Sequence, residues 1–128
     1  MTDTRLVATV YKVLTAQDWQ AAQASGRIHT AVDLADGFVH LSTAAQLPLT
    51  LARYFSHAEQ VMLIAVNPRV LAEKLRFETA VGSDRAGDFP HFYGVLSVEY
   101  VKQVWTLERS AFALPEHLLY EIEVIASP

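Results

Sequence analysis

The sequence contains no cysteine, no long apolar run and no block of like charge. Without cysteine, the chain can form no disulfide, no thiolate metal site and no cysteine nucleophile. No segment approaches the roughly 20 consecutive apolar residues of a membrane helix, and the first residues, Met1 to Arg5, lack the apolar core of a signal peptide. We therefore expect a cytoplasmic domain with no membrane partner.

The common motifs for cofactors, metals and nucleic acids are missing too. The chain has neither a Gly-x-Gly-x-x-Gly loop nor a Walker loop for phosphates. Its five histidines form no His-x-His or His-x-x-x-His pair, so no metal site is predicted. The ten Lys and Arg residues are scattered and the net charge is −4, which argues against binding to a DNA duplex. A small-molecule ligand remains as the expected partner.

The length of 128 residues and the apolar fraction of 52% are typical of one folded domain, predicted over residues 1–128. The β-rich segments predict strands at residues 6–14, 61–66, 75–79, 101–107 and 122–125. Residues 27–35 are expected to be a connector or a short edge strand, 70–75 a short helix, and 81–94 a loop. Because strands and helices mix without strict alternation, we predict the α+β class.

Two segments carry helix-start signals. Thr15, three residues before Asp18, is expected to cap a helix that ends at Gly26. Thr43, three residues before Gln46, is expected to open a second helix through a capping box. The predicted apolar face of this second helix consists of Leu47, Leu51, Tyr54 and Phe55.

The segment 36–46 is the most site-like part of the chain. It starts at an Asp-Gly turn signal, and the following alternation would place Phe38, His40 and Ser42 on one face of a strand. That face presents an imidazole and a hydroxyl roughly 6–7 Å apart along the strand. It leads into a helix N-terminus, which suits an anionic ligand. The alternative for His40 is a buried structural histidine bonded to the backbone.

Residues 89–94, Phe-Pro-His-Phe-Tyr-Gly, bring unusual aromatic character to the predicted loop. Phe89 and Phe92 are expected to pack under the sheet, whereas His91 and Tyr93 add polar tips. Together with His40, these tips are predicted to line a pocket for a planar ring such as a nucleobase or nicotinamide. The alternatives are simple hydrophobic packing and a metal site at the two histidines, which the spacing disfavours.

Charged and hydroxyl side chains complete the candidate site. Arg53 and Arg76 could neutralise a phosphate, or could be plain surface charges. Glu78 could orient a ribose hydroxyl or act as a base, or be an exposed strand carboxylate. Ser42 is a candidate nucleophile activated by His40, although the Gly-x-Ser-x-Gly elbow is absent. The predicted catalytic residues are His40, Ser42, Glu78 and Tyr93, and the predicted ligand-binding residues are Tyr11, Thr43, Gln46, Arg53, Arg76 and His91.

Taken in order, these segments resemble the bacterial family called domain of unknown function 952. The resemblance is carried by residues 11–13, 19, 36–43, 46, 53–55, 75–78 and 89–94. It implies a family-like core at about 8–107, an extension at about 108–128, and an ADP-ribosyltransferase-like fold with a bent, split β-structure and flanking helices. The central segment also looks like part of the RNA 2′-phosphotransferases, which implies NAD or a related nucleotide as cofactor. In those enzymes the first strand carries a His-Gly-Thr motif, whereas this chain has Tyr11-Lys12-Val13.

The leading hypothesis is therefore a pocket for a nucleotide-type or NAD-type ligand, with ADP-ribosyl or related transfer as its chemistry. His40 would bond the ribose or phosphate and Tyr93 would contact the ring, so that catalysis would be mainly electrostatic. The alternatives are a non-catalytic module that binds a small metabolite and a hydrolase with His40 as general base. The chain is expected to be a monomer, or a dimer that buries apolar surface such as Phe112.

Overall fold

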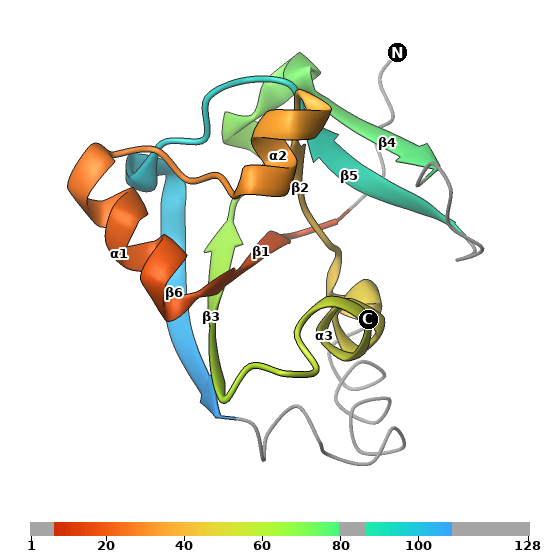
Figure 1. The fold of residues 1–128 in the computed structure, drawn as a ribbon. Coiled ribbons are helices and arrows are strands. Elements are labelled where there is room, and N and C mark those ends of the chain that lie inside the picture. Colours follow the sequence, from red (N-terminus) through yellow and green to blue (C-terminus); the bar gives the residue numbers. More distant parts are fainter. Residues whose placement is uncertain (1–6, 80–86, 109–128) are drawn as a thin grey trace.

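The computed structural model describes residues 7–79 and 87–108, and within them the chain folds into two antiparallel sheets of three strands with helices around them (Figure 1). The elements are β1 (Val10–Thr15), α1 (Ala16–Ser25), α2 (Ala31–Asp36), β2 (Val39–His40), α3 (Leu47–Tyr54), β3 (Gln60–Val66), β4 (Leu75–Thr79), β5 (Asp88–Phe92) and β6 (Val101–Glu108). This architecture confirms the predicted α+β class. Among the described helices, none is long and apolar enough to cross a membrane.

The first sheet has the order β1-β3-β6, so β3 is its central strand, as its continuous apolar sequence predicted. Val61, Ile64 and Val66 are fully buried in it. Alternation along β1 turns Val10, Lys12 and Leu14 to one face of the sheet, and all three are buried. Lys12 therefore points into the interior, toward the second sheet.

The helix α1 begins and ends where the sequence predicts. The Thr15 side chain accepts a hydrogen bond from the backbone N–H of Asp18 at 3.0 Å. Gly26 ends the helix with a left-handed φ of 84°, which is unfavourable for residues with a Cβ. The predicted strand at 6–14 is shifted to Val10–Thr15, so that Thr15 both ends β1 and caps α1.

The predicted connector or edge strand at 27–35 is wrong, because residues Ala31–Asp36 form the helix α2. Thr30 and Asp33 form a capping box at its start, and Gly37 ends it with a φ of 85°. The Asp36-Gly37 pair therefore ends a helix rather than making a hairpin turn. Only Val39 and His40 of the following segment are in a strand.

The second helical region is confirmed with two corrections. Residues Ala44–Gln46 form a 3₁₀ turn before α3, and Gln46 Oε1 accepts from the Thr43 N–H at 2.9 Å. Leu51 is buried on the inner face of α3, but Tyr54 is 60% exposed and does not belong to that face. The short helix predicted at 70–75 is instead two 3₁₀ turns, Pro68–Val70 and Ala72–Lys74.

The predicted loop at 81–94 is wrong in its second half, because Asp88–Phe92 form β5, the central strand of the sheet β2-β5-β4. Its Pro90 pairs with Phe77 of β4, and the Pro90 carbonyl accepts from the Leu41 N–H at 3.0 Å. β5 also pairs with β2, and in this pairing His91 lies opposite His40. The predicted strand at 122–125 and Phe112 lie outside the described residues.

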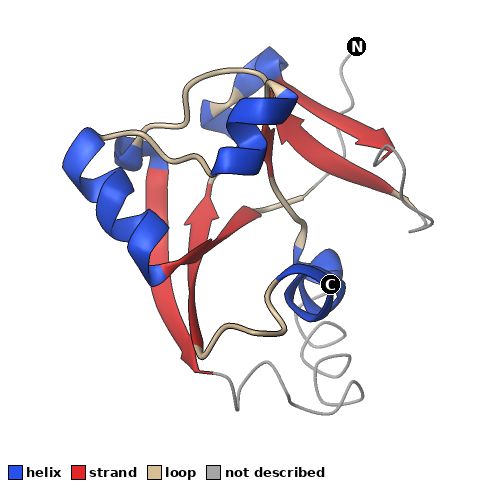
Figure 2. Cartoon of the chain, viewed as in Figure 1, coloured by secondary structure: helices blue, strands red, loops and turns tan. Residues whose placement is uncertain are grey.

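The main core combines residues of both sheets with Ala22 and Trp19 of α1, and Figure 2 shows how the sheets and helices are arranged. It contains side chains from both sheets, including Val10, Ile64, Val39 and Phe92. Two reciprocal backbone hydrogen bonds of 2.8 Å between Tyr11 and Ser42 connect the sheets directly. The candidate site lies at this connected edge, between α2, β2 and the β4–β5 pair.

Candidate functional site

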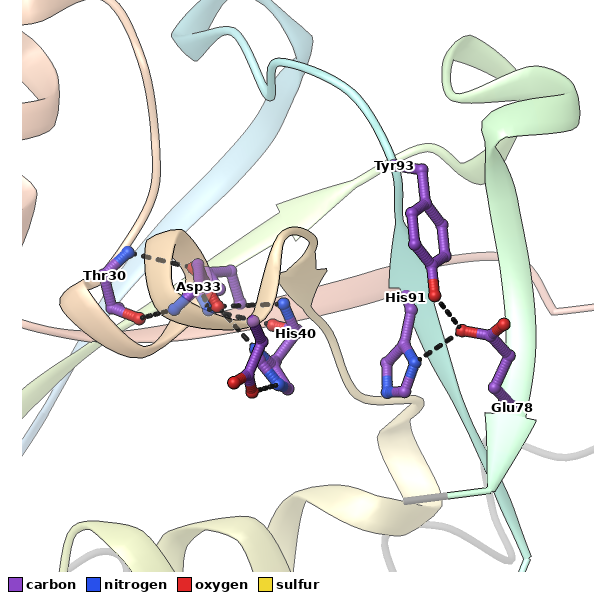
Figure 3. A network of polar contacts seen from close by, with 8 residues as sticks. Thr30, Asp33, His40, Glu78, His91 and Tyr93 are labelled. Carbon is purple, nitrogen blue, oxygen red and sulfur yellow. Dashed lines mark hydrogen bonds and ion pairs between the residues drawn. The ribbon is translucent and has the colours of Figure 1, made fainter. Parts of the chain in front are cut away.

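His40 stands at the end of β2 with both ring nitrogens on carboxylate oxygens (Figure 3). Its Nδ1 lies 2.7 Å from Asp33 Oδ1, and its Nε2 lies 2.9 Å from Asp36 Oδ2. The Asp33 side chain is only 2% exposed, whereas those of His40 and Asp36 are 36% and 46% exposed. The buried Asp33 carboxylate thus fixes the imidazole at Nδ1, and the Nε2 side of the ring faces the exposed Asp36.

Asp33 is held by a dense set of donors. Lys12 Nζ lies 2.8 Å from Asp33 Oδ2 and also donates to the His40 carbonyl at 2.9 Å. The backbone N–H groups of Thr30 and His40 donate to the two oxygens of Asp33 at 2.9 and 3.0 Å. A carboxylate with this many donors has one position only, so it orients the His40 ring.

Burial and pairing act in opposite directions on these groups. Burial by itself raises the pKa of the Asp33 carboxyl, but hydrogen bonds from His40 and the charge of Lys12 together lower that pKa well below its ordinary value. Burial lowers the pKa of Lys12, and the contact with Asp33 partly opposes this effect. Asp33 therefore remains a carboxylate throughout the neutral range.

The two predicted segments, around His40 and around 89–94, do meet. Because β2 pairs with β5, the ring centroids of His40 and His91 are 5.5 Å apart. Phe38 stacks on His91 with a centroid distance of 4.2 Å and lies 5.2 Å from the Tyr93 ring. The result is a group of four rings, partly open to solvent because Tyr93 is 40% exposed.

Glu78 of β4 contacts two members of this ring group, His91 and Tyr93. Its Oε1 accepts from the Tyr93 hydroxyl at 2.7 Å and lies 2.8 Å from His91 Nδ1 (Figure 3). The hydrogen bond from Tyr93 is the largest cause that lowers the pKa of Glu78, and the same bond raises the pKa of Tyr93. Arg76 lies over the Tyr93 ring, with its Cζ 5.6 Å from the ring centroid.

A hollow of about 260 Å³ adjoins the ring group. It is lined by Asp33, Phe38 and Val39 on one side and by Arg27, His29 and Val95 on the other. His40, His91 and Tyr93 do not line it, whereas Phe38, which contacts all three rings, does. A volume of this size is below the roughly 300–1,000 Å³ of pockets for drug-sized ligands.

The other predicted site residues lie away from the ring group or have structural contacts. Ser42 is 4% exposed, and its Oγ is 3.0 Å from the Thr50 hydroxyl. Gln46 donates to the Asp88 carbonyl at 2.7 Å and accepts from Thr43. Tyr11 pairs with Ser42 through its backbone, and Arg53 is exposed on α3. Glu78, His91, Tyr93 and Arg76 are the predicted residues that the fold brings to His40.

Four residues of the site were not assigned a role from the sequence: Lys12, Asp33, Asp36 and Phe38. The Thr30-x-x-Asp33 spacing was a usable signal, because it is a capping box and predicts the helix that carries Asp33 and Asp36. Lys12 gave no signal, since a lysine in an apolar strand is normally on the solvent face. Among the described residues, no group of three or more His, Asp or Glu side chains is arranged to hold a metal ion.

Two small antiparallel sheets and a carboxylate-supported histidine at their common edge define a class of small α+β domain with a surface polar site. The family model described as protein of unknown function (DUF952) matches residues 13–104. The chain belongs to this family, which confirms the resemblance found in the sequence. The ADP-ribosyltransferase-like fold stays a prediction.

Solved structures of one relative share the fold. The crystal structure of protein CC0527 from Caulobacter crescentus is 36% identical, covers 83% of this chain and 99% of that chain, and has a TM-score of 0.71. The solution NMR structure of CC0527 is 40% identical over 78% of this chain and 84% of that chain, with a TM-score of 0.68. No curated protein matches the chain significantly.

Proposed function

We propose that the edge formed by His40, Phe38 and Tyr93 binds a small ligand with a planar ring and polar substituents, of the nucleotide type. The observation that carries this proposal is the convergence of the exposed Tyr93 ring and the half-buried Phe38 ring beside a fixed imidazole. A ligand ring would stack on the open side of Tyr93, and His40 Nε2 would bond an oxygen of the sugar or phosphate in place of Asp36.

Whole NAD fits the described residues poorly. Lys12, in the strand where NAD-binding relatives would carry a histidine, is buried and has all its donors on Asp33 and His40. We therefore derive no ADP-ribosyl transfer step, and a single ring with its sugar and phosphate is the better match.

Thermal unfolding with added AMP, ADP-ribose, NAD and NADP tests this proposal. A ligand that binds only the native state stabilises it by about 2.7 kcal/mol at 100 times its Kd, which raises the Tm by several degrees. AMP should give this increase, and the larger ADP-ribose, NAD and NADP smaller ones. The variant His40→Asn should lose the increase, whereas His57→Asn, at an exposed histidine outside the site, should keep it.

If the wild-type chain is folded and no nucleotide raises its Tm, the proposal is wrong. An increase that His40→Asn retains would place the ligand elsewhere. An increase without any turnover, including release of nicotinamide from NAD, would assign the chain as a non-catalytic binding module.

A hydrolase is a second candidate, and the Asp33–His40 pair favours it. A buried carboxylate on Nδ1 is the arrangement that prepares a histidine to transfer protons at Nε2. Ser42 does not serve as its nucleophile in this proposal, because Ser42 is buried and its hydroxyl contacts Thr50. Water would be the attacking group, and turnover of an ester in the absence of NAD is the expected result.

A further inference from the structure

The site contains two carboxylate-supported histidines rather than one. His40 Nδ1 lies 2.7 Å from Asp33, and His91 Nδ1 lies 2.8 Å from Glu78. The two residues are partners in the β2–β5 pairing, with ring centroids 5.5 Å apart and planes at 66°. A carboxylate on Nδ1 fixes the tautomer and leaves Nε2 as the reacting nitrogen. The two reacting nitrogens, Nε2 of His40 and Nε2 of His91, are therefore both carried by the β2–β5 pair.

The contacts of the two rings imply different protonation states. Both nitrogens of His40 face carboxylate oxygens, of Asp33 and Asp36, and both hydrogen bonds form only when the ring carries two protons. His91 has a carboxylate on Nδ1 alone, and no polar partner contacts its Nε2 within residues 7–79 and 87–108. Figure 3 shows this second nitrogen on the side of the ring away from Glu78.

Burial supports the same assignment for His91. Burial lowers the pKa of His91, and the contacts with Glu78, which raise that pKa, do not cancel the effect. His40 adds to the lowering, and Asp36 opposes it. A neutral His91 places its proton on Nδ1, toward Glu78, and leaves a lone pair on Nε2.

We propose that His91 and His40 form a base–acid pair that hydrolyses a phosphodiester bound at the ring group. This inference depends on the proposed function, since it uses the same binding edge and its hydrolase form. His91 Nε2 takes a proton from water, whose oxygen forms the new P–O bond. The P–O bond to the leaving alcohol breaks, and the leaving oxygen takes the Nε2 proton of His40. The products are a phosphomonoester and an alcohol, and solvent restores the two protonation states.

The charges around the ring group favour a diester over a monoester. With His40 protonated, each carboxylate is offset by one cation: Asp33 by Lys12, Asp36 by His40, and Glu78 by Arg76. A site without net charge suits the single negative charge of a diester better than the double charge of a phosphomonoester. A diester also has a poor alcohol leaving group, which is the case where an acid contributes to the rate.

Asp36 is a positioning residue in this scheme. It holds the proton of His40 Nε2 at 2.9 Å in the free protein, and its side chain is 46% exposed at the end of α2. The leaving oxygen of the substrate takes its place on Nε2. Removal of Asp36 should therefore weaken the acid function, and it should also lower the pKa of the base, His91, which Asp36 raises.

The test uses the whole chain with two probes, bis-p-nitrophenyl phosphate and adenosine 2′,3′-cyclic monophosphate. We expect the wild type to hydrolyse both, with a bell-shaped dependence of kcat/KM on pH. His91→Gln should lower kcat for both probes by about 100-fold or more, whereas His40→Gln should do so for the cyclic monophosphate and much less for bis-p-nitrophenyl phosphate, whose p-nitrophenolate leaves readily without an acid. His91→Gln should remove the acidic limb of the profile and His40→Gln the alkaline limb, whereas Asp36→Asn should move the acidic limb to lower pH, because Asp36 raises the pKa of His91. His57→Gln is the matched control and should keep wild-type rates.

Other outcomes overturn the inference and separate it from the proposed function. If the folded wild type shows a nucleotide-induced increase in Tm but cleaves neither diester, the inference fails and the binding proposal stands. Cleavage of p-nitrophenyl acetate alone would assign a carboxylic ester instead. Wild-type turnover in a folded His91→Gln variant would remove His91 from the chemistry. If the folded wild type shows neither a nucleotide-induced increase in Tm nor turnover, both proposals are wrong.

Discussion

Asp33 connects the interior of the protein to the candidate site, because it binds Lys12 below and His40 above. The variant Lys12→Met would leave this buried carboxylate without its cation. Removing one partner of a buried ion pair typically costs about 3–5 kcal/mol of unfolding free energy. Urea denaturation followed by circular dichroism should show a loss of this size.

Lys102→Met is the matched control, because Lys102 is exposed and its Nζ donates to the half-buried Thr9 at 3.0 Å. Surface changes of this kind usually alter stability by less than about 0.5 kcal/mol. A loss below about 1 kcal/mol in Lys12→Met would mean that the N–H donors of Thr30 and His40 satisfy Asp33 by themselves.

At the residue scale the sequence predicts the ring-bearing members of the site better than the buried ion pair of Lys12 and Asp33. His91 and Tyr93 were found because aromatic and imidazole side chains are unusual in a predicted loop, and His40 was found because it alternates with Ser42 on one strand face. Lys12 and Asp33 were missed, because an ion pair 21 residues apart in the chain is defined only by the packing of α2 over β1. No local pattern contains that information.

At the scale of elements, α2 is the short helix that places Asp33 and Asp36. Thr30→Ala removes the side-chain half of its capping box, in which the Thr30 hydroxyl accepts from the Asp33 N–H at 3.1 Å. We expect a loss of about 1 kcal/mol in urea denaturation. Because α2 carries both carboxylates of His40, the ring resonances of His40 should also shift in an NMR spectrum.

Thr30→Ser keeps the hydroxyl and is the control for this change. It should retain most of the stability and leave the His40 resonances in place. If Thr30→Ala and Thr30→Ser behave alike, the N-cap does not hold α2, and packing alone does.

Two element predictions failed for different reasons. The connector or short edge strand predicted at 27–35 left out the Thr30–Asp33 capping box, which favours a helix. In residues 88–92 a proline argued against a strand. The strand forms nevertheless, because Phe89, Pro90 and Phe92 are buried and the Pro90 carbonyl still accepts from Leu41.

At the scale of the whole molecule, the two sheets should differ in local stability. β3 is hydrogen-bonded on both sides and contains fully buried residues, whereas β4 is an edge strand with exposed Arg76 and Thr79. Backbone amides of 61–66 should therefore exchange with solvent at least about 100-fold more slowly than those of 75–79, because edge segments open locally. Hydrogen exchange followed by NMR measures both sets, and equal protection would mean that the sheets open together.

The α+β class was predictable from composition and element order, but the division into two sheets was not. Strand pairing depends on contacts between distant segments, such as β1 with β3 and β2 with β5. The convergence of His40 with His91 follows from that pairing. The sequence suggested it only through the chemistry of the side chains, not through their spacing.

The backbone link between Tyr11 and Ser42 has a consequence for engineering. It fixes the strand that carries Lys12 against the segment that carries His40, so the polar site is assembled from three separate stretches of chain. Transplanting residues 30–42 alone into another scaffold would omit Lys12, which pairs with Asp33. It would also omit the β4–β5 pair, which carries Glu78 and His91. A functional graft would need all three pieces in their mutual orientation, and any circular permutant should place its new ends outside them.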